Sequence, residues 1–380
     1  MRRDLYTSDH EAFRSTVLEF ISRHVEPHYD EWEKAGIVPR SAWIEAGKQG
    51  LLGTDIDEQY GGGGTNDFRY NAIIRTELTK AGAQGLAIGT HNDVVAPYVT
   101  RLATEEQKQR WLPGFCNGEI ISAIAMSEPA CGSDLRGMQT RAVRDGSDWV
   151  INGRKTFITN GINADLVVTA VKTDEIKGAH GLTLFGIERG MPGFNRGRNL
   201  DKIGWKAQDT AELVFEDVRV PEANILGNLH GGFVHLSENL PQERIAIAIA
   251  GLAAAEKALE ITIEYCKTRT AFGKPIGSFQ NTRFRLAEMA TEVEIAAHYI
   301  DKAIAELNED RLTAVDAAMA KWWTTELQKR VVDTCLQLHG GYGYMLEYPI
   351  AKFYLDARVQ TIFGGTTEIM KEIVGRSLGV

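Results

Sequence analysis

Cysteine is scarce in this chain, with four among 380 residues, at Cys116, Cys131, Cys266 and Cys335. They lie far apart and form no Cys-x-x-Cys pair, so the sequence predicts neither a zinc site nor a disulfide framework. The N-terminus carries an acid at Asp4 and goes straight into helical patterning, without an apolar signal core or a Ser/Arg-rich presequence. We therefore expect a cytoplasmic protein with reduced thiols and no metal.

Long apolar runs and basic tracts are also missing. The longest near-continuous apolar stretch, 245–255, is about half the length that a membrane-crossing helix needs. The 42 Lys and Arg residues are outnumbered by 51 Asp and Glu residues, which gives a net charge of -9 and a field that repels nucleic acid and anionic lipid. We expect no membrane span and no nucleic-acid partner.

The common nucleotide and hydrolase motifs are absent or misplaced as well. The chain contains no Gly-x-Gly-x-x-Gly, Gly-x-x-x-x-Gly-Lys-Ser/Thr or His-Glu-x-x-His sequence, and its Gly-x-Ser-x-Gly match at 375–379 falls at the end of a predicted helix rather than at a strand-to-helix turn. A Rossmann nicotinamide site, P-loop hydrolysis and zinc proteolysis thus lose their best evidence.

What is present, 43% hydrophobic and 24% charged residues, is enough for a large core and two or three domains. From Ser8 to about Gly114, apolar residues recur at intervals of three and four, which predicts several helices. The glycine run 61–64 interrupts them and is interpreted as a mobile loop rather than a phosphate loop.

The pattern changes near Glu119. Short β-favouring runs separated by turn residues predict a strand-rich middle region, at 149–151, 166–171, 182–185 and 213–215. Helical segments then return at 231–265, 279–308, 313–338 and 366–378. Residues 245–249 alone could form an alternating strand, but the Ala, Glu, Lys and Leu-rich sequence continues to Tyr265, which favours a helix. We predict domains 1–118 (helical), 119–230 (β) and 231–380 (helical).

Several Gly/Ser/Thr-rich loops lie beside predicted strands and helix starts, at 126–134, 157–161, 339–344 and 364–368. Backbone N–H groups and hydroxyls in such loops bind phosphates and polar ring edges, particularly where a helix follows, as at Thr366. One such loop alone is usually an ordinary turn. Four of them together in this helix-sheet-helix order argue against coincidence.

Seven motifs carry a family resemblance: AMSEPACGSDL (125–135), FITNG (157–161), KAQDTAEL (206–213), LPQER (240–244), RTAFG (269–273), QLHGGYGY (337–344) and IFGGTTEIM (362–370). With them the chain resembles the acyl-CoA dehydrogenases, most closely the long-chain type. The resemblance implies an α+β fold with an N-terminal helical domain, a middle β-domain and a C-terminal four-helix bundle. It also implies FAD as the cofactor, held between the last two domains and a neighbouring subunit.

The resemblance assigns residues to the cofactor and the substrate. Those expected to line the flavin ring are Met126, Ser127, Phe157, Ile158 and Thr159, and those expected to hold the FAD of the same subunit are Thr366 and Glu368. Positions that reach the FAD of the adjoining subunit are matched by Arg269, Phe272, Gln280, Gln337 and Gly341, which implies a homo-oligomer, by resemblance a tetramer. The substrate positions are matched by Ser133, Arg244 and Gly365, the first two contacting the CoA portion.

Three of these positions have other interpretations. Arg269 could be only a cation at a helix end. Phe157 stands where many relatives have Trp, and aromatic residues beside a strand are usually core. Cys131 stands where Gly or Ala is common, so that a redox role competes with that of a small buried residue.

The implied reaction is α,β-dehydrogenation of a fatty acyl-CoA thioester to the trans-2-enoyl-CoA. A base removes the Cα proton while a hydride leaves Cβ for flavin N5, and hydrogen bonds stabilise the thioester oxygen. Many relatives place the base where this chain has Gly364, which cannot accept a proton. Glu243 matches the alternative base position of the long-chain and isovaleryl types, the competing interpretation being a first-turn acid at a helix start. The Gly364 N–H matches the donor to the thioester oxygen.

Other functions remain open at this stage. An acyl-CoA oxidase would pass electrons to oxygen instead of to an electron-transferring flavoprotein, and it usually carries an additional C-terminal helical region that is absent after Val380. A nucleic-acid-associated relative is disfavoured by the net charge of -9. Short branched acyl-CoA thioesters are the alternative substrates, because a base at the position of Glu243 also occurs in branched-chain enzymes.

Overall fold

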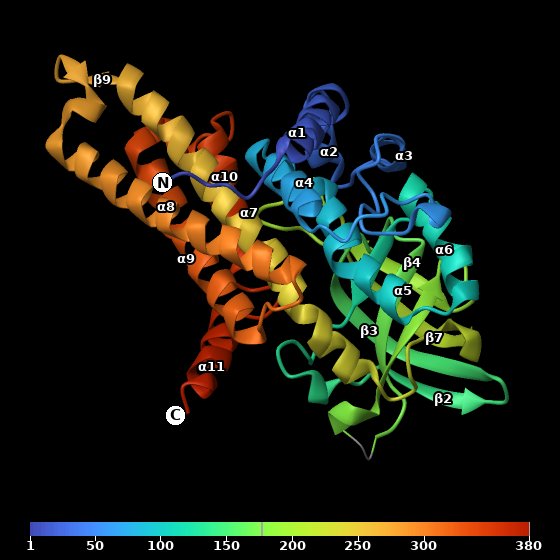
Figure 1. Ribbon diagram of the computed structural model, residues 1–380. Coiled ribbons are helices and arrows are strands. Elements are labelled where there is room, and N and C mark those ends of the chain that lie inside the picture. Colours follow the sequence, from blue (N-terminus) through green and yellow to red (C-terminus); the bar gives the residue numbers. More distant parts are fainter. Residues whose placement is uncertain (176–177, 380) are drawn as a thin grey trace.

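The computed structural model describes residues 1–175 and 178–379. Six α-helices build the N-terminal region: α1 (Ser8–Phe20), α2 (Tyr29–Ala35), α3 (Arg40–Lys48), α4 (Arg69–Lys80), α5 (Ala96–Leu102) and α6 (Glu105–Asn117). Two π-helical segments, Ile21–Val25 and Thr90–Val95, continue α1 and precede α5. These helices cover one side of the sheet and the flank of the long helix α7 (Gly232–Thr268), where Lys80 pairs with Glu256 (Figure 1). The predicted helical N-terminal region is confirmed.

The glycine run is a loop, as predicted, but a closely packed one. The Gly63 N–H donates to the Gly53 carbonyl at 3.0 Å and the Gly64 N–H to the Ile56 carbonyl at 2.8 Å. A Cβ atom on Gly62 would lie 2.1 Å from the Ile56 oxygen. The glycines therefore allow close backbone approach within the loop, while its mobility stays a prediction.

The middle region is an eight-stranded mixed sheet. Its strands are β1 (Ser122–Ala125), β2 (Arg141–Asp145), β3 (Asp148–Thr159), β4 (Leu166–Lys172), β5 (Leu182–Glu188), β6 (Phe194–Asn199), β7 (Thr210–Pro221) and β8 (Ile225–Leu226). The strand order is β6-β7-β3-β2-β4-β5-β8, and β1 pairs in parallel with β4. All four predicted runs are strands. The exposed pattern of β2 and the polar sequence of β6 concealed those two strands.

The C-terminal region is helical, with α7 (Gly232–Thr268), α8 (Gln280–Asn308), α9 (Ala314–His339), α10 (Pro349–Gln360) and α11 (Thr367–Ser377), and a small hairpin of β9 (Thr270–Ala271) and β10 (Lys274–Pro275). Helices α7 to α10 pack on one another, and α11 packs on α9. The fourth bundle helix is therefore α10, which the sequence analysis missed, whereas the predicted segment 366–378 is the appended α11. The domain boundaries themselves stay a prediction.

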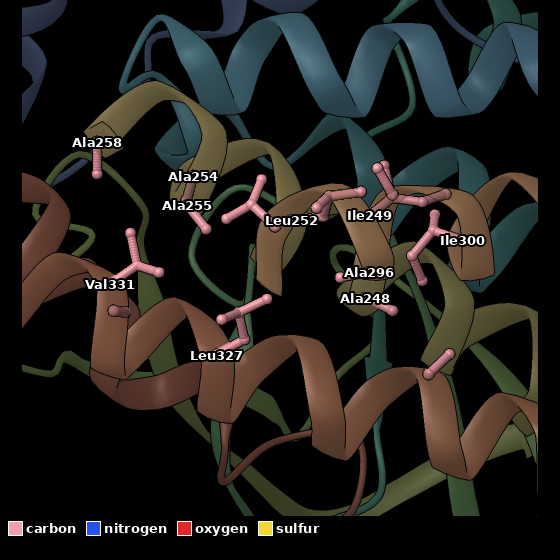
Figure 2. Packing of buried hydrophobic residues seen from close by; sticks show 14 of the residues in the cluster. Ala248, Ile249, Leu252, Ala254, Ala255, Ala258, Ala296, Ile300, Leu327 and Val331 are labelled. Carbon is pink, nitrogen blue, oxygen red and sulfur yellow. The ribbon is translucent and has the colours of Figure 1, made fainter. Parts of the chain in front are cut away.

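Small side chains let the long helices approach closely. Figure 2 shows alanines of α7 facing Leu327 and Val331 of α9, with Ala296 and Ile300 of α8 beside them. A Cβ atom on Gly251 of α7 would lie 3.4 Å from the Thr324 backbone of α9. This alanine-rich seam fixes α7 rigidly against α9, and residues of both helices then point into the site described below.

The described part of the chain bears on three expectations from the sequence, which concern a membrane span, a metal site and the cysteines. None of its helices is long and apolar enough to cross a membrane. Within it, no group of three or more His, Cys, Asp or Glu side chains is arranged to hold a metal ion. All four cysteines are free and buried. Cys131 is 3% exposed and its thiol donates to the Asp134 carbonyl at 3.0 Å, as expected of a small buried residue.

Candidate active site

Glu243 is a buried carboxylate in the interior of α7, and its side chain meets Tyr98 of α5. The residue is 4% exposed, and the Tyr98 hydroxyl donates a 2.9 Å hydrogen bond to Oε1. Burial raises the pKa of Glu243 to about 7, although the Tyr98 hydrogen bond and the Arg244 charge act in the opposite direction. The carboxylate is thus suited to accept a proton near neutral pH in a dry environment.

The competing interpretation of Glu243 as a first-turn acid is wrong. Helix α7 begins at Gly232, so Glu243 lies about three turns inside it. The helix passes through Pro241, which has no N–H to donate. A carboxylate at this depth gains little from the helix N-terminus, so its burial requires another reason.

Two buried cations lie near Glu243. Arg244 is 5% exposed, and its Nε has no hydrogen-bond partner among the residues that the structure describes. Lys321 of α9 is fully buried and donates from Nζ to the Gly365 carbonyl at 2.6 Å. Burial and the neighbouring Arg244 charge lower the pKa of Lys321 to about 8. A buried guanidinium whose Nε makes no hydrogen bond among the described residues is a candidate ligand-binding group, although the Glu243 carboxylate lies near enough to act on its charge.

The turn before α11 brings Gly364 to the Glu243 side of α7. Gly364 has φ of +64°, and a Cβ atom there would lie 2.3 Å from Cδ1 of Ile247. Ile247 follows Glu243 by one helical turn, so the two candidate positions for a base approach the same stretch of α7. On the other side, the Phe363 ring makes an edge contact with Trp205 at 5.6 Å.

The loop after β1 is fixed by a buried ion pair. The Lys155 ammonium lies 2.8 Å from a Glu128 oxygen, and both side chains are almost completely buried. Burial pushes the pKa of Glu128 upward, but Lys155 and the N–H groups of Thr140 and Gln139 bring it below its usual range. Lys155 also donates to the Met126 carbonyl at 3.1 Å. The pair therefore anchors the predicted flavin loop at its first residue.

The predicted flavin-lining residues lie together at the ends of β1 and β3. The Thr156 N–H donates to the Ser127 carbonyl at 3.0 Å and joins the two segments. Phe157 is 70% exposed and has φ of +61°, so the core interpretation of this ring is wrong. Ile158 points into the sheet core with 2% exposure, which leaves only its backbone to face a ligand, and Thr159 is half-buried.

Other predicted residues occupy loop and helix ends. Ser133 is exposed in the loop that follows Cys131. Thr366 caps α11, and its hydroxyl accepts a 3.3 Å hydrogen bond from the Ile369 N–H, while Glu368 is exposed in the first turn. The N-terminus of α11 thus presents backbone donors beside the Gly364–Gly365 turn.

A second group of predicted residues lies at the other end of the bundle, near β9 (Figure 1). Arg269, Gln337 and Gly341 line a hollow of about 460 Å³, and the Arg269 guanidinium lies 5.4 Å from the Tyr342 ring centre. Phe272 is 94% exposed, and Gln280 is the exposed first residue of α8. Lys321 and Gln337 are about 24 Å apart along α9, so the two groups form separate surfaces on one chain.

Sequence reasoning missed Tyr98, Lys321 and the Glu128–Lys155 pair. Tyr98 is 145 residues from Glu243, and Lys321 is 44 residues from Gly365. Each lies in a helical pattern in which an aromatic or long side chain normally has a packing or solvent role. The one available signal was Glu128 inside the motif 125–135, and no spacing connects it with Lys155.

Comparisons with known proteins agree with this architecture. Family models for the N-terminal, middle and C-terminal domains of acyl-CoA dehydrogenase match residues 7–119, 123–218 and 230–379. The long-chain specific acyl-CoA dehydrogenase of Sus scrofa is 48% identical over 99% of this chain and 88% of its own length. The isovaleryl-CoA dehydrogenase of Solanum tuberosum is 35% identical over 98% and 91%. A crystal structure of an acyl-CoA dehydrogenase from Geobacillus kaustophilus is 48% identical, covers both chains completely and superposes with a TM-score of 0.98.

The fold is that of an oxidoreductase that acts on acyl thioesters. The chain belongs to the acyl-CoA dehydrogenase family, whose members are FAD-dependent enzymes. The predicted family, the α+β three-domain fold and the class of enzyme are confirmed.

Proposed function

We propose that this protein oxidises a straight-chain or modestly branched fatty acyl-CoA to the trans-2-enoyl-CoA, with Glu243 as the base that removes the Cα proton. The observation that supports this most directly is the environment of Glu243, which is buried, has its pKa raised to about 7 and lies on α7 beside the Gly364 turn. Gly364 itself has no side chain that could take the proton.

Several residues of the chain have separate roles in the proposed reaction. Glu243 accepts the Cα proton, and the Gly364 N–H donates to the thioester oxygen as negative charge develops there. Arg244, whose Nε has no hydrogen-bond partner in the described part of the chain, binds the CoA portion together with Ser133, and Gly365 completes the substrate side of the turn. FAD, when bound, accepts the hydride from Cβ.

The residues present fit FAD at the sheet-bundle junction. Met126, Ser127 and Thr159 offer backbone and hydroxyl groups at adjacent strand ends, and Phe157 provides an exposed ring on a fixed backbone. Thr366 and Glu368 stand at the first turn of α11. The backbone N–H groups and hydroxyls among them suit the polar edge and the phosphates of a flavin nucleotide.

We infer that the distal group completes the FAD site of a neighbouring copy, so that the enzyme is a homo-oligomer, by family resemblance a tetramer. The group, which comprises Arg269, Phe272, Gln280, Gln337 and Gly341, is exposed on the isolated chain and offers one cation, two amides and a glycine turn. Arg269→Ala should weaken FAD retention by about tenfold or more, because a charge-assisted contact is lost. Full retention by a protein whose light-scattering mass equals one chain would contradict the proposal.

The test of the base is Glu243→Gln, which keeps the size and polarity of the side chain but removes the proton acceptor. FAD content and acyl-CoA binding should remain, while anaerobic flavin reduction slows by about 100-fold or more. Reduction at the wild-type rate would refute the assignment. Glu128→Gln is a poor control because it disturbs the flavin loop, whereas Glu105→Gln changes a carboxylate at the start of the surface helix α6.

Moving the base to position 364 is harder than the sequence suggested. Gly364→Glu puts a side chain on a left-handed backbone and against Ile247, so it should fail to restore activity to Glu243→Gln. The same change combined with Ile247→Ala provides space. Partial recovery in the triple variant would show that the pocket accepts a base from either position.

Substrate length and electron acceptor complete the proposal. We propose an electron-transferring flavoprotein as acceptor, and turnover with it should greatly exceed turnover with oxygen, whereas an oxidase would show the reverse. Turnover of saturated thioesters from butyryl-CoA to long-chain acyl-CoA, with isovaleryl-CoA included, separates the long-chain from the branched-chain assignment. A cytoplasmic location stays a prediction, because the pig and potato relatives are mitochondrial by name.

A further inference from the structure

We propose that Tyr98 is a positioning residue for proton abstraction: its hydroxyl holds the Glu243 carboxylate in place and stabilises the ionised form. This inference rests on the proposed role of Glu243 as base. It concerns a residue on a different helix and in a different domain, to which neither the motifs nor the comparisons give any role.

The contact is built from rigid parts. Tyr98 lies in α5, where Pro97 occupies the first turn, and its side chain is 1% exposed. It belongs to a buried cluster that includes Val95, Val99 and Leu236, the last of these from the first turn of α7. A ring packed on all sides has one orientation, so the hydroxyl is a fixed donor to Glu243.

The direction of the hydrogen bond determines its effect. Burial, followed by the Glu243 charge, raises the pKa of Tyr98 well above its usual value, so the phenol keeps its proton throughout the working range. It can therefore donate to the carboxylate at every relevant pH. Among the described residues, Tyr98 is the donor of a hydrogen bond to the Glu243 carboxylate. A carboxylate with so few donors depends strongly on each one.

Other charged groups surround the pair on each packed element. From α7 comes Arg244, and from α9 comes Lys321, which acts on Arg244. From α5, Arg101 contacts Asn239 at 3.4 Å, and in the π-helical segment Asp93 is paired with Arg75 while its carbonyl accepts from Gln242. None of these groups has a recorded hydrogen bond to the Glu243 carboxylate within the part of the chain that the structure describes. Replacing Tyr98 therefore alters the position of the Glu243 carboxylate without changing the net charge of the site.

The test is Tyr98→Phe in the full-length FAD-loaded enzyme, which removes one oxygen and keeps the ring. The rate constant of substrate-driven flavin reduction should rise with pH as Glu243 ionises. In the variant this rise should shift to higher pH by about one to two units, with about tenfold slower reduction at neutral pH. Infrared difference spectra against Glu243→Gln report the carboxyl group directly and should show the same shift without turnover.

Tyr60→Phe is the matched control. The Tyr60 hydroxyl donates to Glu105 at 2.7 Å, so this change deletes a tyrosine-to-glutamate hydrogen bond of the same kind elsewhere in the same domain. It should leave the pH profile of flavin reduction unchanged. A shift in Tyr60→Phe equal to that in Tyr98→Phe would overturn the proposal, since general loosening of the domain would then explain both.

A fluorinated tyrosine at position 98 tests the proposal in the opposite direction. It leaves no cavity, so the test remains informative if Tyr98→Phe folds poorly. Its more acidic phenol is a stronger donor, so the Glu243 titration should move to lower pH. An unchanged titration in both variants refutes the role of Tyr98, even when Glu243→Gln remains slow. Fast reduction in Glu243→Gln would instead refute the base, so the two failures are distinguishable.

Discussion

Two buried glutamates of this enzyme differ in the hydrogen-bond donors and charges that surround their carboxylates. Glu128, between β1 and β2, has an ammonium 2.8 Å away and accepts from two backbone N–H groups. Glu243, in α7, has the Tyr98 hydroxyl. The pKa of Glu128 falls below its usual range, whereas that of Glu243 rises to about 7. A buried carboxylate with a counter-ion and several hydrogen-bond donors stays ionised and serves the structure. A buried carboxylate with few donors can take up a proton.

The largest expected effect comes from removing Lys155, the partner of Glu128. Lys155→Met leaves a buried carboxylate without its counter-ion, and we expect the free energy of unfolding to fall by about 3–5 kcal/mol, with loss of FAD. Denaturant unfolding and flavin absorbance measure both effects. Adding Glu128→Gln should recover part of the stability, because the orphaned charge is gone, and a double variant as unstable as the single one would contradict the argument.

The second prediction compares the two glutamates across pH. The folded state holds the Glu243 proton up to about pH 7, against 4.5 for an ordinary glutamate, so the unfolded chain binds fewer protons in this window and stability declines as pH rises. Glu243→Gln removes that decline and should stabilise the protein at pH 8 relative to pH 5 by roughly 3 kcal/mol. Glu128→Gln should destabilise at both pH values, because its ionised form is the favoured one. Parallel denaturation curves at the two pH values test this, and equal behaviour of the two variants would contradict it.

The contrast extends to the lysines. Lys155 has a carboxylate partner, whereas Lys321 contacts the Gly365 carbonyl. Lys321→Met should loosen the Gly364–Gly365 turn and lower kcat/KM by about tenfold, with FAD content retained. Lys202→Met is the matched control, since Lys202 donates to the Gln208 carbonyl at 2.6 Å in another loop. Equal losses in the two variants would remove any special role for Lys321.

The smallest predicted effect concerns helix caps. Thr366 caps α11 beside the proposed FAD site, and Thr313 caps α9 on the outside of the bundle. Replacing either by Ala should cost about 1 kcal/mol of stability, because one helix-end N–H loses its acceptor. Only Thr366→Ala should also weaken FAD retention, as measured by flavin release on dilution. Equal release from both variants would assign Thr366 a structural role alone.

The family resemblance indicated Glu243, because Gly364 stands at the more usual base position and cannot accept a proton, whereas Glu243 matches the alternative base position. Sequence reasoning reached the long helices and the central strands through periodicity and length. It could not reach Tyr98 or Lys321, since their roles depend on contacts between distant segments rather than on local pattern. It also missed α10, a 12-residue helix with a mixed polar and aromatic sequence, although Pro349 at its start is a typical helix signal.

The contact between Gly364 and Ile247 bears on how such enzymes diverge. A carboxylate placed at position 364 would meet Cδ1 of Ile247 on another helix, so this side chain must shift or become smaller before the proposed base could move there from position 243. Shrinking Ile247 first opens a cavity in a working pocket, and introducing the acid first strains the turn. Each change made alone is therefore expected to be costly, and the packing of one isoleucine couples the residue allowed at position 364 to the one at position 247.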